Sequence, residues 1–251
     1  MLEIRKLRRF LRFLAGFIDE QEIWPRHRVY VDVLILALLS KAIRVGQAVC
    51  VLVAAGFDDE AFGLGRTLID IALTVRYISN GDSFECSRRY AEFFGKDHEQ
   101  WTKLIQKYYP GQKFRVGPHH EKMLELAKKF KSPHQWTGLG DQTKAMAMED
   151  DRVEYDPQSG APVRWEFDYE VSYKWTSHFV HATVSSLDTH VPARDPFRVH
   201  SGTQRIPKGD IALFNVAIYL WRICICGFRE LKIEFSPELS RSFDETIAAL
   251  R

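Results

Sequence analysis

The stretch Val29–Ala55 constrains the fold of this chain more than any other segment. It is rich in Val, Leu, Ile and Ala, and its few polar positions include Asp32, Lys41 and Arg44. It is too long for a β-strand and too apolar for a helix that lies on a protein surface. We therefore expect a helix buried at the centre of a helical protein, ended by Gly56.

The remaining segments also carry helical patterns. Residues 2–20 place Leu7, Phe10 and Leu11 on one side and several arginines on the other, which predicts an amphipathic helix. No segment alternates apolar and polar residues over the length of a strand. Further helices are expected at 60–79, 84–109, 118–131, 167–189, 210–231 and from Ser236 to the C-terminus. The sequence thus predicts an all-α fold, an irregular bundle of about eight helices.

Helix boundaries are marked by local signals. Asp82 or Ser83 is a typical N-cap for the helix after Asn80-Gly81, and Ser236-Pro237 is typical of another helix start. We expect a single helical domain over residues 1–251. Its parts are an amphipathic helix at 1–24, a central part at 29–190, a proline-rich loop at 191–208 and C-terminal helices at 209–251.

Composition narrows the class of protein. The net charge of +2 disfavours a nucleic-acid binder that is basic over its whole surface. The four cysteines lack zinc-finger spacing and are expected as small hydrophobes in a reducing compartment. The longest uncharged apolar run, 45–57, is shorter than the roughly 20 residues of a membrane span. Arginines interrupt any signal-peptide pattern at the N-terminus. These features predict a cytoplasmic protein without a membrane span.

The segment that best indicates a site is 173–181. Tyr173, Ser177 and His181 follow each other at four-residue steps, so a helix would place a phenol, a hydroxyl and an imidazole on one face. Lys174 and His178 lie beside that face. The group is compatible with a reaction centre or a polar clamp, and equally with hydrogen-bonded packing.

A second charged pair lies in an apolar segment. Arg66 and Asp70 are four residues apart and are surrounded by Leu, Ile and Val. Burying a charge is costly unless it is paired. One interpretation is an intrahelical salt bridge. The other is an arginine directed at an anion, with Asp70 holding it in place.

Two further chemistries are compatible with the segment 173–181. His178 and His181 are three residues apart and converge on a helix, which suits a metal pair. No other motif supplies the remaining ligands, so no metal and no cofactor is expected. Ser177 with His181 is a nucleophile–base combination, but the serine lacks the glycine-flanked turn of hydrolases.

The motifs also follow a recognisable order. Arg66-x3-Asp70 comes after the long apolar helix, then Trp136-Thr137-Gly138, then Tyr173-x3-Ser177-x3-His181. In this order the chain resembles, over roughly residues 29–190, a bacterial family of unknown function. Its members carry R-x3-E, W-[ST]-G and Y-x3-S-x3-H motifs. Asp70 departs from this pattern, because an aspartate side chain is shorter than that of the expected glutamate.

The resemblance implies an all-α fold. It also implies that these motif residues converge, although they are far apart in the chain. Genomic neighbourhoods of some members imply a role in phage defence or in mobile elements.

Three functions remain open at the level of the sequence. The first is a binding or interaction protein. In it the cluster recognises a small anionic ligand or RNA, or only fixes the helix packing while the function lies in association with a partner protein. The second is a metal-independent, nuclease-like effector with His181 as general acid or base and Arg66 stabilising negative charge. In it Tyr173 and Ser177 orient a substrate that Trp136, Lys174 and His178 contact. The third is a metal-dependent hydrolase that uses His178 and His181. Abundant apolar helices are also compatible with a homodimer.

Overall fold

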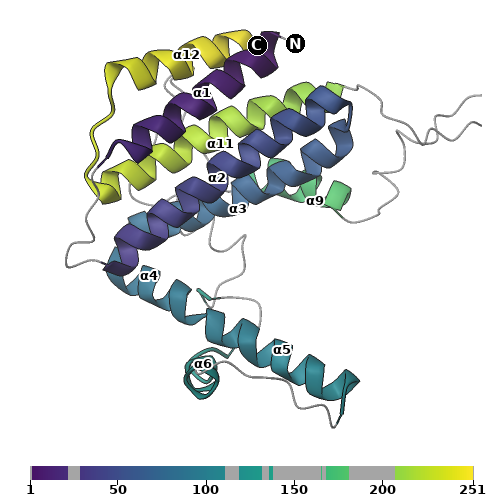
Figure 1. Ribbon diagram of the computed structural model, residues 1–251, viewed down its shortest axis with the longest axis vertical. Coiled ribbons are helices and arrows are strands. Elements are labelled where there is room, and N and C mark those ends of the chain that lie inside the picture. Colours follow the sequence, from purple (N-terminus) through teal and green to yellow (C-terminus); the bar gives the residue numbers. More distant parts are fainter. Residues whose placement is uncertain are drawn as a thin grey trace, which may run out of the picture.

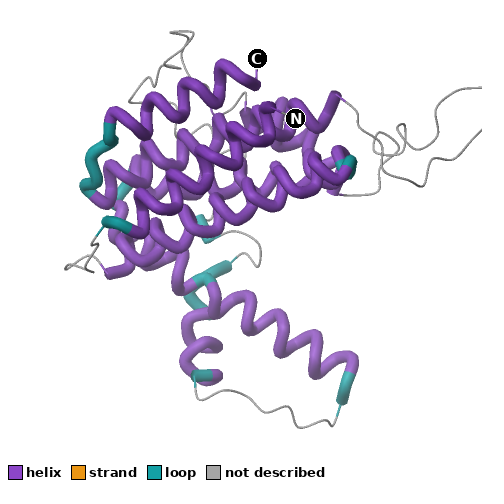
Figure 2. Tube along the Cα trace, turned by 45° about the horizontal axis from the view of Figure 1, so that its top comes forward, coloured by secondary structure: helices purple, strands orange, loops and turns teal. Residues whose placement is uncertain are grey.

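The computed structural model describes residues 2–21, 29–110, 119–131, 136–137, 165, 168–180 and 207–250. These residues are mostly helical and none of them lies in a strand (Figure 2), which confirms the all-α prediction. The helices are α1 (Leu2–Asp19), α2 (Val29–Ala55), α3 (Asp58–Asn80), α4 (Ser83–Glu92), α5 (Phe94–Tyr108), α6 (His120–Ala127), the π-helical turn η1 (Asp168–Tyr173), α9 (Lys174–Val180), α11 (Pro207–Leu231) and α12 (Pro237–Leu250).

Three long helices, α2, α3 and α11, pack on one another at the centre of the bundle (Figure 1). The predicted central helix begins and ends where expected, and it buries Ile35, Leu39 and Val49 completely. Helix α11 contributes a similar apolar side, with Leu213 and Leu220 fully buried. Because each of these helices has a wide apolar surface, only packing between them removes it from water.

Helices α1 and α12 cover one side of this centre (Figure 1). The predicted amphipathic helix is confirmed as α1, in which Leu7, Phe10 and Leu11 are fully buried. Phe10 meets Phe243 of α12 with ring centroids 6.0 Å apart, and Trp221 of α11 stacks on the same ring at 4.2 Å. These aromatic contacts join the N-terminal and C-terminal helices.

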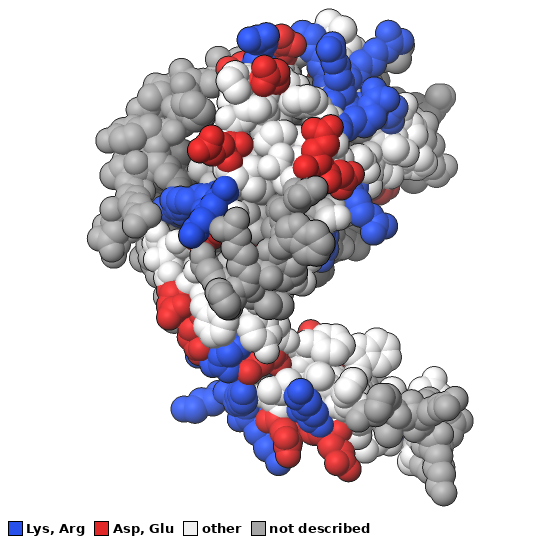
Figure 3. All heavy atoms as spheres, turned by 60° about the vertical axis from the view of Figure 1, so that its left-hand side comes forward, with Lys and Arg blue, Asp and Glu red and all other residues white. Residues whose placement is uncertain are grey.

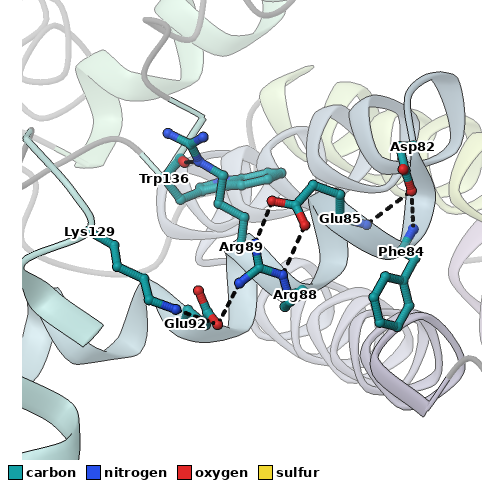
Figure 4. Close-up of polar contacts among 8 residues, drawn as sticks. All are labelled: Asp82, Phe84, Glu85, Arg88, Arg89, Glu92, Lys129 and Trp136. Carbon is teal, nitrogen blue, oxygen red and sulfur yellow. Dashed lines mark hydrogen bonds and ion pairs between the residues drawn. The ribbon is translucent and has the colours of Figure 1, made fainter. Parts of the chain in front are cut away.

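The predicted helix boundaries follow local chemistry. Asp82 Oδ1 accepts hydrogen bonds from the backbone N–H groups of Phe84 and Glu85, both at 3.1 Å (Figure 4). Ser236 Oγ accepts one from Leu239 at 3.0 Å. Gly56 has φ 81°, a conformation that glycine adopts without strain, and it ends α2. All three signals are therefore confirmed as helix boundaries.

Helix α11 begins three residues before the predicted start, at Pro207. A proline at the first helical position needs no hydrogen-bond partner for its nitrogen. A methyl group on Gly209 would lie 2.7 Å from the carboxyl carbon of Asp58, which is 1% exposed. The carboxylate of α3 thus lies against the first turn of α11, where negative charge is favoured. The rest of the loop predicted at 191–208 falls outside the described residues.

The prediction of one continuous helix over 84–109 is wrong. The structure has two helices, α4 and α5, which meet at Phe93. The Phe93 ring lies edge-on to Phe130 at 5.2 Å. Gly95 lies so close to α6 that a methyl group there would be 2.6 Å from the Met123 carbonyl oxygen. Contacts with α6 therefore accompany the break, and Gly95 is the one residue near it that disfavours a helix interior.

One other predicted helix is also shorter in the structure, and a second is described only in part. The helix expected at 118–131 is α6, His120–Ala127. The helix expected at 167–189 starts as the π-helical turn η1 and continues as α9 to Val180. Residues 181–206 lie outside the described part.

Helices α5 and α6 form an arm that leaves the bundle at the N-terminal end of α5 (Figure 1). The two helices of the arm pack closely on each other, and α4 joins them to α2 and α3. Figure 3 shows basic and acidic side chains interspersed over the described residues of the bundle and the arm on the face in view. This mixture agrees with the small net charge of the chain.

Two helices are long and apolar enough to cross a membrane by length and composition, namely Tyr30–Ala55 and Lys208–Leu231. Their mean hydropathies are 1.8 and 1.9. They are the helices α2 and α11 at the centre of the bundle, and the core helix of a soluble protein passes the same test. The length criterion alone does not assign them to a membrane.

The four cysteines are free thiols. Cys50, Cys224 and Cys226 are buried, as predicted, whereas Cys86 is half-buried. Burial raises the pKa of Cys50 to about 11, although the nearby Arg8 guanidinium opposes the shift. These thiols therefore act as core residues rather than as thiolates.

Candidate functional site

Helix α3 supplies one side of the candidate site. Arg66, Asp70 and Tyr77 are separated by four and seven residues, so they lie along one side of that helix. The opposite side of α3 is buried against α2 and α11 through residues such as Leu68 and Val75. The packing of the bundle thus fixes the direction of the polar side.

Arg66 of α3 is bound to Tyr173, the last residue of η1. Its Nη2 donates a hydrogen bond to the Tyr173 hydroxyl oxygen at 2.5 Å, and its guanidinium carbon lies 4.5 Å from the centroid of the same ring. A cation over the face of a phenol is attracted by the ring quadrupole. The structure therefore brings together two predicted site residues from distant parts of the chain.

The Arg66 Nε is buried and has no hydrogen-bond partner among the described residues. A guanidinium presents its donors in a fixed fork that fits carboxylate and phosphate groups. In the described contacts this fork is bound to Tyr173 and not to Asp70. The intrahelical salt bridge considered for Arg66 and Asp70 is thus not the contact that holds the guanidinium.

The π-helical turn η1 brings a second tyrosine to the site. Tyr169 stacks on Tyr173 with centroids 4.9 Å apart and rings inclined by 18°. Single π-turns widen a helix locally and are frequent at functional sites. Lys174 lies 5.6 Å from the Tyr169 centroid and forms an ion pair with Glu170. The predicted substrate-binding Lys174 is therefore exposed and already paired.

The predicted site residue Ser177 forms a hydrogen bond within its own helix. Its hydroxyl donates to the backbone carbonyl of Tyr173 at 2.7 Å, and Thr176 makes the same kind of bond to the carbonyl of Ser172 at 2.7 Å. Such bonds to the carbonyl four residues earlier are common for Ser and Thr inside helices. The donated proton is thus used structurally, which does not favour Ser177 as a nucleophile.

Asp70 lies near Tyr90 of α4. Burial raises the pKa of Tyr90, and the negative charges of Asp70 and then Asp97 raise it further. The phenol is therefore held neutral well above neutral pH. On the polar side of α3, Asp70 thus lies between Arg66 and a group of aromatic residues further along the helix.

Trp136 lies among those aromatic residues. Its ring is edge-on to Tyr77 at 5.4 Å and to Tyr90 at 5.1 Å, and it is 9% exposed. Arg89 Nε donates to the Trp136 carbonyl oxygen at 2.7 Å (Figure 4). The predicted Trp136 is thus fixed to α3 and α4 by packing on both sides and by one charge-assisted hydrogen bond.

Trp136 is nevertheless distant from Arg66. Tyr77 is eleven residues after Arg66 on the same helix, which corresponds to about 16 Å along the axis. The described motif residues therefore lie at two places along α3 rather than at one point. Arg66 with Tyr173 forms one end, and Trp136 with Tyr77 forms the other.

An ion-pair network holds α4 and α6 beside Trp136. Arg88 binds Glu85 at 2.5 Å and Glu92 at 2.7 Å, and Glu92 also binds Lys129 at 2.9 Å (Figure 4). Half-exposed pairs of this kind contribute little individually, and a network contributes more. It links α4 to the segment after α6.

Two predicted residues lie beyond this description. His181 falls outside the described residues, and so does the side chain of His178. Within the described part of the chain, no group of three or more His, Cys, Asp and Glu side chains is placed to hold a metal ion.

The sequence reasoning missed the tyrosines that frame the site, Tyr77, Tyr90 and Tyr169. Tyr169 is four residues before Tyr173, and Tyr77 is seven after Asp70, so helical spacing from the predicted residues was the available signal. Tyr90 comes from another helix and had no such signal.

Residues 32–197 of the chain match DUF5677, a family of unknown function. The chain belongs to this family. The match covers about two thirds of the chain and confirms the resemblance to a family of unknown function. It includes most of α2 and all of α3, α4, the arm, η1 and α9, whereas α1, α11 and α12 lie outside it. No curated protein and no solved structure matches the chain.

Proposed function

We propose that this DUF5677 member is a cytoplasmic binding protein that recognises a small anionic ligand through Arg66. The observation that supports the proposal is the environment of the Arg66 guanidinium. It is held against the ring and hydroxyl of Tyr173, while its buried Nε has no hydrogen-bond partner among the described residues.

A buried N–H without a partner costs about 1–3 kcal/mol. An anion that accepts from the Arg66 fork would remove this cost and neutralise the charge. Beside Arg66, the stacked rings of Tyr169 and Tyr173 form an aromatic wall. A phosphate or carboxylate group attached to a planar ring fits such a wall, because the ring can stack while the anion binds the guanidinium.

The proposal is tested by isothermal titration calorimetry with inorganic phosphate, nucleoside monophosphates and a short single-stranded RNA. We expect binding by the wild-type chain and at least tenfold weaker binding by Arg66→Met. Arg9→Met is the matched control, because Arg9 is exposed on α1 at the other side of the bundle. Equal binding by Arg66→Met and wild type would exclude Arg66 as the recognition residue.

A nuclease-like effector is the alternative function. In it Arg66 would stabilise negative charge that develops on a phosphodiester, and His181 would act as general acid or base. The Ser177 hydroxyl, which donates to the Tyr173 carbonyl, supports this reading less than the binding function. Cleavage of RNA or DNA by wild type and its loss in a folded His181→Ala variant would favour the alternative. The metal-dependent hydrolase hypothesis rests on His178 and His181, and no described contact adds support to it.

A role in phage defence or in a mobile element is proposed only through the family resemblance. Its test is induced expression in a bacterial host, with and without phage challenge, for wild type and Arg66→Met. Protection or toxicity that Arg66→Met loses at unchanged melting temperature would connect the Arg66 end of α3 to that role.

A further inference from the structure

Helix α5 exposes an apolar stripe that is not covered by the described residues of the chain. Phe94, Trp101, Leu104 and Tyr108 have exposed fractions of 61%, 67%, 51% and 64%. Together with Asp97 they occupy successive steps of three and four residues, which is the heptad spacing of a helix that pairs with another helix. Large side chains on such a stripe are expected to be covered by a partner.

The stripe is separate from the side of α5 that packs on α6. Gly95 is buried against the backbone of α6, and His98 contacts His120 of α6 with ring nitrogens 2.6 Å apart. One side of α5 is therefore already covered by α6 within the arm. Its second side, with Trp101 at the centre, faces away from that contact.

We propose that this stripe pairs with the same stripe of a second copy of the chain, as an antiparallel helix pair centred on Trp101. Phe94 and Tyr108 are each seven residues from Trp101, on opposite sides of it. A twofold axis at Trp101 places the two tryptophans together and Phe94 of each copy beside Tyr108 of the other. A surface that pairs with its own copy must be self-complementary. This stripe meets the requirement in its spacing, because Phe94 and Tyr108 are equally far from Trp101.

One charge within the stripe and one beside it fit the same arrangement. Asp97 lies four residues before Trp101 and Lys107 lies six after it, so antiparallel pairing brings Asp97 of one copy to within about 3 Å, along the axis, of the level of Lys107 of the other. Asp97 lies within the stripe and Lys107 lies beside it, about 80° from Asp97 around the helix. The twofold axis therefore creates two Asp97–Lys107 contacts, whereas a parallel pair creates none at this level.

The geometry of the arm agrees with an antiparallel pair. Each α5 leaves its bundle at the N-terminal end (Figure 1), so the two bundles lie at opposite ends of the paired helices. Large aromatic side chains bury roughly 150–250 Å² each. Two stripes together thus remove on the order of 1,000 Å² from water, near the lower limit of a specific interface. The pair is expected to be weak and to depend on concentration.

The first experiment measures mass by sedimentation equilibrium over a range of concentrations. We expect wild type to approach twice the 29.2 kDa of one chain as the concentration rises into the micromolar range. Trp101→Glu should raise the dissociation constant at least about thirtyfold. Val51→Glu is the matched control, because Val51 is an apolar residue with 57% exposure on α2 of the bundle, and it should dimerise like wild type.

The second experiment tests the register. Asp97→Lys and Lys107→Asp should each be monomeric alone, since each puts like charges opposite one another in a homodimer. A mixture of the two variants should dimerise, because both contacts then join opposite charges. Circular dichroism melting checks that each variant is folded. A wild type that stays monomeric at all concentrations would overturn the proposal. So would a Trp101→Glu dimer as strong as wild type, or separate variants that dimerise as well as their mixture.

Discussion

The Arg66 guanidinium lies against the ring and the hydroxyl of Tyr173, a residue 107 positions later in the chain. One side chain thus makes both a hydrogen bond and a cation–π contact with the same partner. This pair ties η1 to α3 and defines one end of the proposed binding site.

Tyr173→Phe separates the two contacts. It removes the hydroxyl that accepts from Arg66 and keeps the ring under the guanidinium. We expect the free energy of unfolding to fall by about 1.5–3 kcal/mol, because hydrogen bonds to charged groups contribute in this range. Urea unfolding followed by circular dichroism measures it. Tyr30→Phe is the control, since that ring is 45% exposed and should change stability by less than about 0.5 kcal/mol. Equal effects of the two variants would show that the bond to Arg66 contributes nothing.

Trp136→Ala should destabilise the chain strongly. The ring is packed between Tyr77 and Tyr90, so its removal leaves a cavity. We expect the free energy of unfolding to fall by about 3–5 kcal/mol. Trp101→Ala removes a ring of the same size that is 67% exposed, and below the concentration of dimerisation it should cost less than about 0.5 kcal/mol. Thermal melts at low concentration compare the two. Similar losses of stability in both variants would contradict the assigned burial of Trp136.

Gly95→Ala should weaken the arm even though alanine favours helices. Its methyl group would lie 2.6 Å from the Met123 carbonyl oxygen and 2.8 Å from Leu126 Cβ. We expect a loss of about 1–3 kcal/mol from this overpacking. Gly65→Ala provides the contrast, because nothing lies within 4 Å of a methyl group there and the helix should gain up to about 1 kcal/mol. Hydrogen exchange of α5 and α6 locates the effect in the arm. Faster exchange there in Gly65→Ala than in Gly95→Ala would contradict the close contact.

Tyr90 should titrate at higher pH than an ordinary tyrosine, since burial and then Asp70 raise its pKa. Asp70→Asn removes one negative charge and should lower the pKa of Tyr90 towards its usual value. NMR titration of tyrosines labelled at the ring carbon that bears the hydroxyl follows this residue separately.

The raised pKa of Tyr90 also has a consequence for stability. The folded state binds the phenol proton more tightly than the unfolded state does, so this contribution is complete below the unfolded pKa of about 10. It is lost as the pH rises from that value through the folded pKa. Wild type should therefore lose more stability than Tyr90→Phe in this alkaline window, and parallel curves would exclude the effect.

The parts of the fold that depend on neighbouring residues were predictable from the sequence. Val29–Ala55 was predicted with both ends, since its length and its Gly56 stop are properties of the segment itself. The same is true of the Asp82 and Ser236 caps. Such features need no knowledge of the tertiary structure.

The parts that depend on distant residues were not predictable in the same way. The break at Phe93 accompanies contacts with α6, and the partner of Arg66 comes from η1. Spacing along α3 indicated that Arg66 and Asp70 share a side, but it did not reveal that Asp70 lies near Tyr90. The motif order of the family grouped Trp136 with Arg66, whereas packing separates them along the helix.

The contact between Asp58 and Gly209 joins a helix inside the family match to one outside it. Helix α11 also covers the apolar sides of α2 and α3 over most of their length (Figure 1). A protein cut to residues 32–197 would therefore expose a long apolar trough to water, and its folding would require a substitute for α11. We therefore expect the segment that matches the family to depend on α11 for its folding in this chain.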